Sequence, residues 1–105
     1  MAVLVFVNGK GVKKQDYENL RKEVGWEQNQ PKGVIIHIAG VDAAGDMQVA
    51  DVWETEGDFN NFVNTRLAPG YEKFKLPQPA VSMFPVYNTN VFEQIEQFRS
   101  AGATQ

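Results

Sequence analysis

The stretch VADVWETEGDFNNFVNTRL, residues 49–67, decides the fold of this chain because it joins a strand to an amphipathic helix. The strand begins upstream at Asp46, ends at Glu54 and is mostly apolar, as buried strands are. Thr55 can then cap a helix, and Asp58 gives a weaker form of the Ser/Thr-x-x-Glu capping box. The apolar side chains of this helix share one face: Phe59, Phe62, Val63 and Leu67. A strand followed by a helix is therefore predicted.

The segments upstream of this stretch repeat the same two patterns. A valine-rich run over residues 2–8 predicts a strand. A helix should follow, because apolar residues from Tyr17 to Val24 lie at helical spacing and Gly25 is placed to end it. Residues 33–40 predict another strand, which should form a hairpin with the strand of the opening stretch.

Downstream, the pattern predicts one more strand and a tail. The pair Pro69-Gly70 should stop the second helix, and residues 80–87 then read as a fourth strand. Asn90 and Glu93 form a cap pair for a third helix over residues 90–100, with a frayed end beyond it.

The element order βαββαβ predicts an α+β protein with the ferredoxin-like fold. In that fold, four antiparallel strands form one sheet and both helices cover one of its faces. A chain of 105 residues with 43% hydrophobic content fits one compact domain. We expect that domain over residues 1–88, followed by a C-terminal helical extension and tail over residues 89–105.

Both faces of the predicted sheet are apolar. Residues 3–7 and 34–36 lack the alternation with polar residues that half-exposed antiparallel strands show. Two helices cover one face, and the other would exceed the few hundred Å² of apolar patch usual for monomers. We therefore predict a homodimer whose sheets pack face to face as a dimeric α/β barrel. The third helix could fold back onto its own sheet or cross to the partner.

Composition argues against several classes of function. The formal charge is -3, from ten basic and thirteen acidic residues spread along the chain, so nucleic acid is not an expected partner. No apolar run approaches the roughly 20 residues that span a bilayer, and the N-terminus does not read as a signal peptide. We expect a cytoplasmic protein without membrane contact. Without cysteine, thiolate catalysis and metal sites built on sulfur are excluded.

Two residues break the apolar pattern of the sheet. His37, the only histidine, lies in an aliphatic strand, and an imidazole of ordinary pKa, about 6.5, exchanges protons near neutral pH. Asp51 interrupts the next strand, where a buried carboxylate needs a hydrogen bond, an ion pair or a proton. One hairpin register puts both on the same face, and the other puts them on opposite faces. A packed histidine, and Asp51 paired with Arg66 or Lys22, are the structural alternatives.

Four further residues are candidates for substrate binding. Trp53 shares a face with Asp51 by strand alternation, and Phe62 lies on the following helix. Asn8 ends the first strand, where its amide could donate to a ligand carbonyl or close the turn. Tyr17 could place its hydroxyl at the mouth of a pocket. Core packing is the alternative for the three aromatic residues. A lone histidine offers no basis for a metal site.

Residues 2–88 resemble the dimeric α/β-barrel proteins related to antibiotic-biosynthesis monooxygenases. Those proteins carry a strand, Trp-Glu-[Ser/Thr] and a helix with inward aromatics in this order, as in the opening stretch. The resemblance implies a pocket between sheet and helices and a cofactor-independent enzyme for an apolar, aromatic or polyketide-like molecule. His37 would be the base, with Asp51 as its orienter. Asn8 would stabilise an enolate, and Trp53 with Phe62 would form an aromatic wall. A related isomerase or cyclase would use the same residues without oxygen.

Two other functions are alternatives to this enzyme. Haem-degrading relatives share Asn8 and the Trp-Glu-Ser-like start of the helix. They carry a tryptophan where this chain has Phe62 and a haem-ligating histidine near Tyr71, so we do not predict haem degradation, and no cofactor is expected. The remaining alternative is a non-catalytic homodimer that binds a small ligand or a protein.

Overall fold

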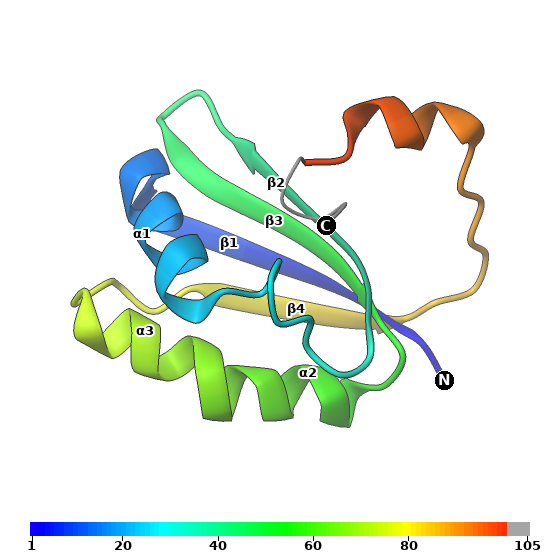
Figure 1. Ribbon diagram of the computed structural model, residues 1–105, viewed down its shortest axis with the longest axis horizontal. Coiled ribbons are helices and arrows are strands. Elements are labelled where there is room, and N and C mark those ends of the chain that lie inside the picture. Colours follow the sequence, from blue (N-terminus) through cyan, green and yellow to red (C-terminus); the bar gives the residue numbers. More distant parts are fainter. Residues whose placement is uncertain (101–105) are drawn as a thin grey trace.

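The computed structural model describes residues 1–100 and contains a four-stranded antiparallel sheet in the order β2-β3-β1-β4 (Figure 1). Its elements in chain order are β1 Val3–Lys13, α1 Lys14–Val24, β2 Val34–Val41, β3 Asp46–Trp53, α2 Glu56–Phe62, the π-helical segment η1 Val63–Leu67, α3 Ala68–Lys73, β4 Ala80–Pro85 and the 3₁₀ segment η2 Glu93–Phe98. The order of elements and of strands confirms the predicted ferredoxin-like fold. None of the helices over residues 1–100 combines the length and the apolar character that crossing a membrane requires.

The helices α1, α2 and α3 lie against one face of the sheet (Figure 1). The core on that side is made by Val5, Trp53, Phe59 and Phe62. The opposite side, which we call the open face, carries large apolar residues at matching cross-strand positions: Leu4, Phe6, Ile36, Ile38, Val52 and Phe84. Several of these are about half exposed, so the sheet is apolar on both sides, as the sequence predicted.

The second helix does not stop at Pro69-Gly70, which corrects the prediction. Thr55 caps its start, since the hydroxyl oxygen accepts a hydrogen bond from the Asp58 N–H at 3.0 Å. The chain then remains helical through η1, where the Ala68 N–H donates to the Val63 carbonyl, and continues into α3. Pro69 has no N–H to donate, so it interrupts the helical hydrogen-bond pattern. The wider π turn just before it accommodates this interruption.

Gly70 serves packing and not helix termination. It is buried where α1 and α3 meet, and a Cβ added there would lie 3.0 Å from Leu20 Cδ2 and 3.2 Å from Val24 Cγ2. The absence of a side chain therefore lets the two helices approach each other.

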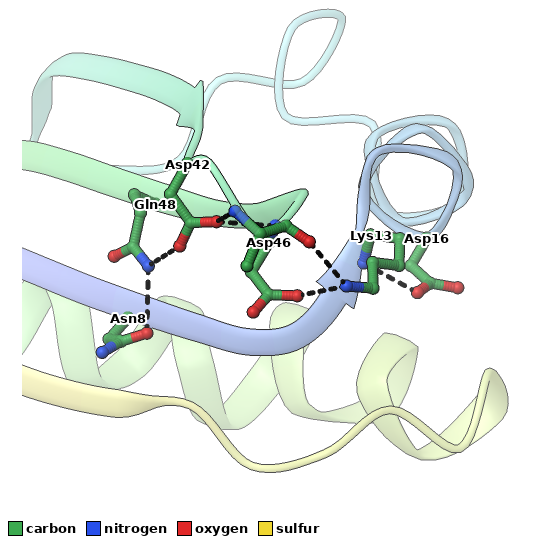
Figure 2. A network of polar contacts seen from close by, with 7 residues as sticks. Asn8, Lys13, Asp16, Asp42, Asp46 and Gln48 are labelled. Carbon is green, nitrogen blue, oxygen red and sulfur yellow. Dashed lines mark hydrogen bonds and ion pairs between the residues drawn. The ribbon is translucent and has the colours of Figure 1, made fainter.

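The loop of the β2–β3 hairpin is held by one carboxylate. Oδ1 of Asp42 accepts hydrogen bonds from the Ala44 and Asp46 N–H groups, both at 3.0 Å. Gly45 has a φ of 86°, which suits glycine and closes the turn. The Lys13 ammonium, at the end of β1, lies 2.6 Å from Asp46 Oδ1 and fixes the loop to the neighbouring strand (Figure 2).

These loop contacts select the register of the hairpin. Nε2 of Gln48 donates to Asp42 Oδ2 at 3.0 Å and to Asn8 Oδ1 at 3.1 Å, across β3 to β1 (Figure 2). The resulting register places His37 directly opposite Asp51. A slip of one residue would turn one of the two side chains to the other face, so the loop decides whether they can meet.

Gly9→Ala should lower the free energy of unfolding by about 1–3 kcal/mol. A Cβ at Gly9 would lie 2.6 Å from the Met47 carbonyl oxygen, so one of two paired strands has to shift. Gly40→Ala is the matched control, because within residues 1–100 no atom outside Gly40 and its two chain neighbours lies within 4 Å of its added Cβ. Urea unfolding measures both variants, and equal losses would contradict this account.

The C-terminal segment, residues 86–100, which we call the arm, is helical over a shorter range than predicted. Only Glu93–Phe98 are helical, with 3₁₀ geometry, and the N-cap position is Phe92 without a side-chain cap. The predicted Asn90-Glu93 cap pair is therefore wrong. The predicted fraying of residues 101–105 lies outside the described residues.

Candidate functional site

Four side chains on the helix-covered side of the sheet are linked in a row, and we call them the relay. Tyr17 Oη lies 2.6 Å from His37 Nε2. The other ring nitrogen of His37, Nδ1, lies 2.7 Å from Asp51 Oδ1. Trp53 Nε1 donates to Asp51 Oδ2 at 3.1 Å. The predicted pair of His37 and Asp51 is thus in hydrogen-bond contact, and the predicted Tyr17 and Trp53 extend it at both ends.

The donor inventory of the relay fixes its hydrogen-bond directions when Asp51 is a carboxylate and His37 is a neutral imidazole. An indole N–H can only donate, and a carboxylate can only accept. His37 then donates from Nδ1, which leaves its Nε2 lone pair to accept from the Tyr17 hydroxyl. The relay therefore holds the imidazole in the tautomer whose basic nitrogen points away from the carboxylate, toward Tyr17.

Local structure accounts for this arrangement. His37 and Asp51 are direct partners between β2 and β3, and Trp53 lies two residues further along β3 on the same face. Tyr17 reaches the sheet from near the start of α1. The four residues thus depend on one hairpin register and on the position of one helix.

Burial increases from His37 to Asp51 and Trp53. The His37 and Asp51 side chains are 29% and 8% exposed, and the whole Trp53 residue is 2% exposed. Both oxygens of the buried carboxylate are occupied, and no buried side-chain polar atom within residues 1–100 lacks a partner. The basic nitrogen is therefore carried by a member of the relay that is more exposed than the carboxylate.

Burial raises the pKa of the Tyr17 hydroxyl well above its ordinary value of 10.0. The negative charges of Glu27 and Asp51 raise the pKa further, while the positive charge of Arg21 opposes them. Tyr17 thus keeps its proton across the neutral pH range and acts as a hydrogen-bond donor.

Tyr17→Phe should make the fold less sensitive to alkaline pH. Because the pKa of Tyr17 is raised in the folded state, the Tyr17 hydroxyl gives its full contribution to stability at pH values below the ordinary tyrosine pKa. This contribution is lost as the pH rises above about 10. Phenylalanine removes this titration, while Tyr71, whose pKa burial also raises, titrates in both proteins. Urea unfolding at about pH 8 and about pH 10.5 measures the difference. An equal loss of stability in the two proteins would contradict the raised pKa of Tyr17.

Trp26 completes the site and was not predicted from the sequence. Its ring centroid lies 5.5 Å from those of both Tyr17 and His37, and the latter two rings are stacked with 5° between their planes. Trp26 directly follows Gly25, whose left-handed conformation ends α1. A hydrophobic residue after such a glycine commonly packs back on its helix, and this signal identifies Trp26.

Asn8 and Phe62 do not line a pocket with His37. Asn8 pairs with Gln48 on the open face of the sheet, so within one chain the prediction that it shares a pocket with His37 is wrong. The ring of Phe62 is buried 5.4 Å from that of Trp53. These two aromatic rings form core and not an exposed wall.

Arg66 has partners other than Asp51. Its Nη2 donates to the carbonyl oxygens of Val24 at 3.0 Å and Asn29 at 2.8 Å. The guanidinium thereby ties η1 to the end of α1 and the loop after it. The predicted alternative of an Arg66–Asp51 ion pair is therefore not formed.

Two hollows lie along the open face, and Asp51 is the relay residue that borders the second of them. The first, of about 330 Å³, is bounded by Phe6, Asn8, Ile38, Gln48 and Ser82, among others. The second, of about 570 Å³, lies between the open face and the start of the arm. On the helix-covered side, where a pocket was predicted, aromatic rings of the core pack against one another. Over residues 1–100, no three carboxylate or imidazole groups come together to hold a metal ion.

Searches with the sequence find no matching family model and no matching curated protein. Solved structures match in fold. SnoaB, a cofactor-independent oxygenase from Streptomyces nogalater, superposes with a TM-score of 0.57 at 13% identity, over 84% of this chain and 93% of its own.

Two further structures extend the comparison. A candidate antibiotic biosynthesis monooxygenase from Deinococcus radiodurans gives a TM-score of 0.56 at 10% identity, over 88% of this chain and 98% of its own. The hydroxynitrile lyase of Passiflora edulis gives 0.53 at 15% identity, over 86% and 96% of the two chains. This chain thus has the fold of the antibiotic-biosynthesis-monooxygenase-like proteins, and at these identities the likeness concerns the fold.

Proposed function

We propose that this protein is a small monooxygenase-like enzyme that uses acid–base chemistry, without a bound cofactor, on an apolar aromatic or polyketide-like molecule. The observation that carries the proposal is the contact of His37 with a carboxylate at one ring nitrogen and a hydroxyl at the other. A base oriented by a buried acid is the arrangement that proton abstraction requires.

Each member of the relay has a role in this mechanism. His37 Nε2 takes a proton from an acidic C–H or O–H group of the substrate, which replaces the Tyr17 hydroxyl at that nitrogen. Asp51 holds the ring in place and stabilises the imidazolium that forms. Tyr17 keeps its own proton and donates a hydrogen bond to the oxygen of the substrate anion.

The substrate anion supplies the electrons for the oxidation. A CH₂ group activated by a neighbouring carbonyl reacts with dioxygen to give C=O and water, so one oxygen atom enters the product and the other leaves. SnoaB, which has this fold, is described as a cofactor-independent oxygenase, and this supports an oxidation of that kind. The hydroxynitrile lyase with the same fold is not an oxygenase by name, and this supports the related isomerase or cyclase as the oxygen-free alternative.

We propose that the enzyme works as a homodimer in the cytoplasm. The support is the apolar open face, where Phe6, Ile38 and Phe84 are 45%, 53% and 53% exposed. Soluble monomers rarely leave large contiguous apolar patches in water. A second copy with the same face is the partner that covers it.

His37→Gln tests the enzymatic role. With a panel of polycyclic aromatic ketones that carry an acidic CH₂ group, oxygen uptake by the wild-type protein should exceed that of the variant by about 10²–10⁴-fold. Lys10→Gln, which changes an exposed residue of β1, is the control and should retain full turnover. Circular dichroism verifies that both variants are folded. Equal turnover by His37→Gln and wild type, or no turnover of any member by wild type, would overturn the proposal.

A second candidate is the non-catalytic ligand-binding homodimer. It is favoured by the packed aromatic core beside the relay and by the position of both hollows on the open face. In that case His37→Gln should lower the free energy of unfolding by about 1–3 kcal/mol, because the Asp51 carboxylate loses a buried donor. Binding of an apolar dye to the open face should then remain unchanged, and the ketone panel should show no turnover.

A further inference from the structure

The contact between Tyr17 and His37 also has the geometry from which a phenol can give up an electron. Loss of one electron turns a phenol into a radical cation, which is a very strong acid, so the proton has to leave together with the electron. Tyr17 has an acceptor for that proton, because its Oη lies 2.6 Å from His37 Nε2. The proton therefore moves only a short way along an existing hydrogen bond.

The rest of the relay stabilises the transferred proton. When Nε2 takes the proton, His37 becomes an imidazolium whose other nitrogen, Nδ1, lies 2.7 Å from Asp51 Oδ1. The carboxylate is itself held by the Trp53 indole, which donates to Oδ2 at 3.1 Å. The positive charge thus forms beside a buried negative charge that already faces it. The relay accepts the proton without the movement of a side chain.

The surroundings of Tyr17 favour the joint loss of proton and electron. Burial raises the pKa of the Tyr17 hydroxyl, so a phenolate does not form first at neutral pH. The electron has a short path outward through Trp26. The ring of Trp26 is partly exposed, and its centroid lies 5.5 Å from that of Tyr17.

The other two tyrosines of the chain lack this arrangement. His37 is the only histidine, and its Nε2 is already in contact with Tyr17. Tyr87 is fully exposed, so its proton can pass only to water or to a buffer base. For Tyr71, burial is the one cause that raises its pKa. Tyr17 is therefore the tyrosine that has an imidazole as its proton acceptor.

We propose that Tyr17 is a redox-active residue that gives one electron to an organic peroxyl radical while its proton passes to His37. The Tyr17 O–H bond breaks, and an N–H bond forms at His37 Nε2. The peroxyl radical gains the electron and becomes a peroxide anion. A neutral phenol and a neutral imidazole thus become a phenoxyl radical and an imidazolium. Radicals of this class oxidise phenols and require no binding site of their own. The step needs no bound substrate, so it goes beyond the proposed acid–base reaction.

Light-triggered oxidation by tris(bipyridine)ruthenium(III) tests the route of the proton. Two proteins each keep a single tyrosine: Tyr71→Phe/Tyr87→Phe keeps Tyr17, and Tyr17→Phe/Tyr71→Phe keeps Tyr87. His37→Gln is then added to each of them. The rate at which tyrosyl absorption appears should fall at least about 10-fold in the protein that keeps Tyr17. It should stay the same in the protein that keeps Tyr87. An unchanged rate in the former would overturn the proposal.

The concentration of buffer base provides a second measurement, which needs no change at His37. A phenol that passes its proton to solvent is oxidised faster when more buffer base is present. The rate in the protein that keeps Tyr17 should not depend on the phosphate concentration at constant pH and ionic strength. The rate in the protein that keeps Tyr87 should rise. An equal rise in both would assign the proton of Tyr17 to solvent and refute its transfer to His37.

The class of oxidant is tested on the wild-type protein. A water-soluble azo compound releases peroxyl radicals on warming, and a nitroso spin trap marks the tyrosine on which a radical forms. Mass spectrometry compares the adducts at Tyr17 and Tyr87. Their ratio should fall at least about 10-fold in His37→Gln, because Tyr17 loses its proton acceptor. Adducts at Tyr87 without any at Tyr17 in the wild-type protein would exclude Tyr17 as a donor to peroxyl radicals.

Discussion

Trp53→Ala should lower the free energy of unfolding by about 3–5 kcal/mol, which is a large part of the roughly 5–15 kcal/mol that stabilises a domain. Trp53 is 2% exposed at the centre of the core, with ring centroids 5.6 Å from Phe59 and 5.4 Å from Phe62. Its removal leaves a cavity between sheet and helix, and it strands one oxygen of the Asp51 carboxylate, which loses the indole donor.

Two companion variants divide this loss into its causes. Trp53→Phe keeps most of the ring but removes the indole N–H, so it should cost about 1–3 kcal/mol through the unpaired carboxylate oxygen. Trp26→Ala removes a tryptophan that is only half-buried and should cost less than half as much as Trp53→Ala. Urea unfolding followed by circular dichroism measures the three variants. A loss below about 1 kcal/mol for Trp53→Ala would show that its core is not the one described.

The parts of the fold that sequence predicted correctly are those fixed by local chemistry. Thr55 caps α2 through its own hydroxyl, and Gly25 ends α1 in a left-handed conformation. Each of these two helix ends depends on one residue and its immediate neighbours, so the residue type is enough to locate the helix end.

The failed boundaries have different causes. Pro69-Gly70 reads as a stop, but α3 continues through it because a π turn absorbs the proline and the glycine packs against α1. The cap predicted at Asn90 is not formed, because the helical segment begins later, after an extended Phe92. Neither the π turn of η1 nor the packing of Gly70 against α1 can be predicted from the sequence around Pro69-Gly70.

The candidate site was predicted in its chemistry but not in its geometry. His37 and Asp51 were singled out because polar groups inside apolar strands need partners, and they partner each other. Whether they share a face depends on the hairpin loop, in particular on the hydrogen bonds that Asp42 accepts. The role that the resemblance implied for Asn8 put it on the wrong face of the sheet. The side chains of β1 alternate between the two faces, and this alternation places Asn8 on the open face, away from His37.

Asp51→Leu should destabilise the fold by removing both hydrogen bonds that the Asp51 carboxylate accepts. Leucine offers no acceptor, so the buried Nδ1–H of His37 and Nε1–H of Trp53 both lose their partner. Each stranded donor costs about 1–3 kcal/mol, and the two losses add because each donor loses a different oxygen. Asp51→Ala would combine this effect with a cavity, whereas leucine fills the space and isolates the hydrogen bonds.

Asp51→Asn separates the structural role of the relay from its proposed chemical role. The amide keeps one oxygen acceptor and turns an NH₂ group toward the other donor, so the expected loss of stability is only about 1–3 kcal/mol. If the oxygen remains with Trp53, the amide donates to Nδ1 of His37 and forces the proton onto Nε2, where the proposed reaction needs a lone pair. Turnover should then fall by about four orders of magnitude, the effect that the wrong histidine tautomer has in serine protease triads. Urea unfolding and oxygen uptake on the same samples provide the comparison. A variant that loses stability and keeps its turnover would assign Asp51 to the fold alone.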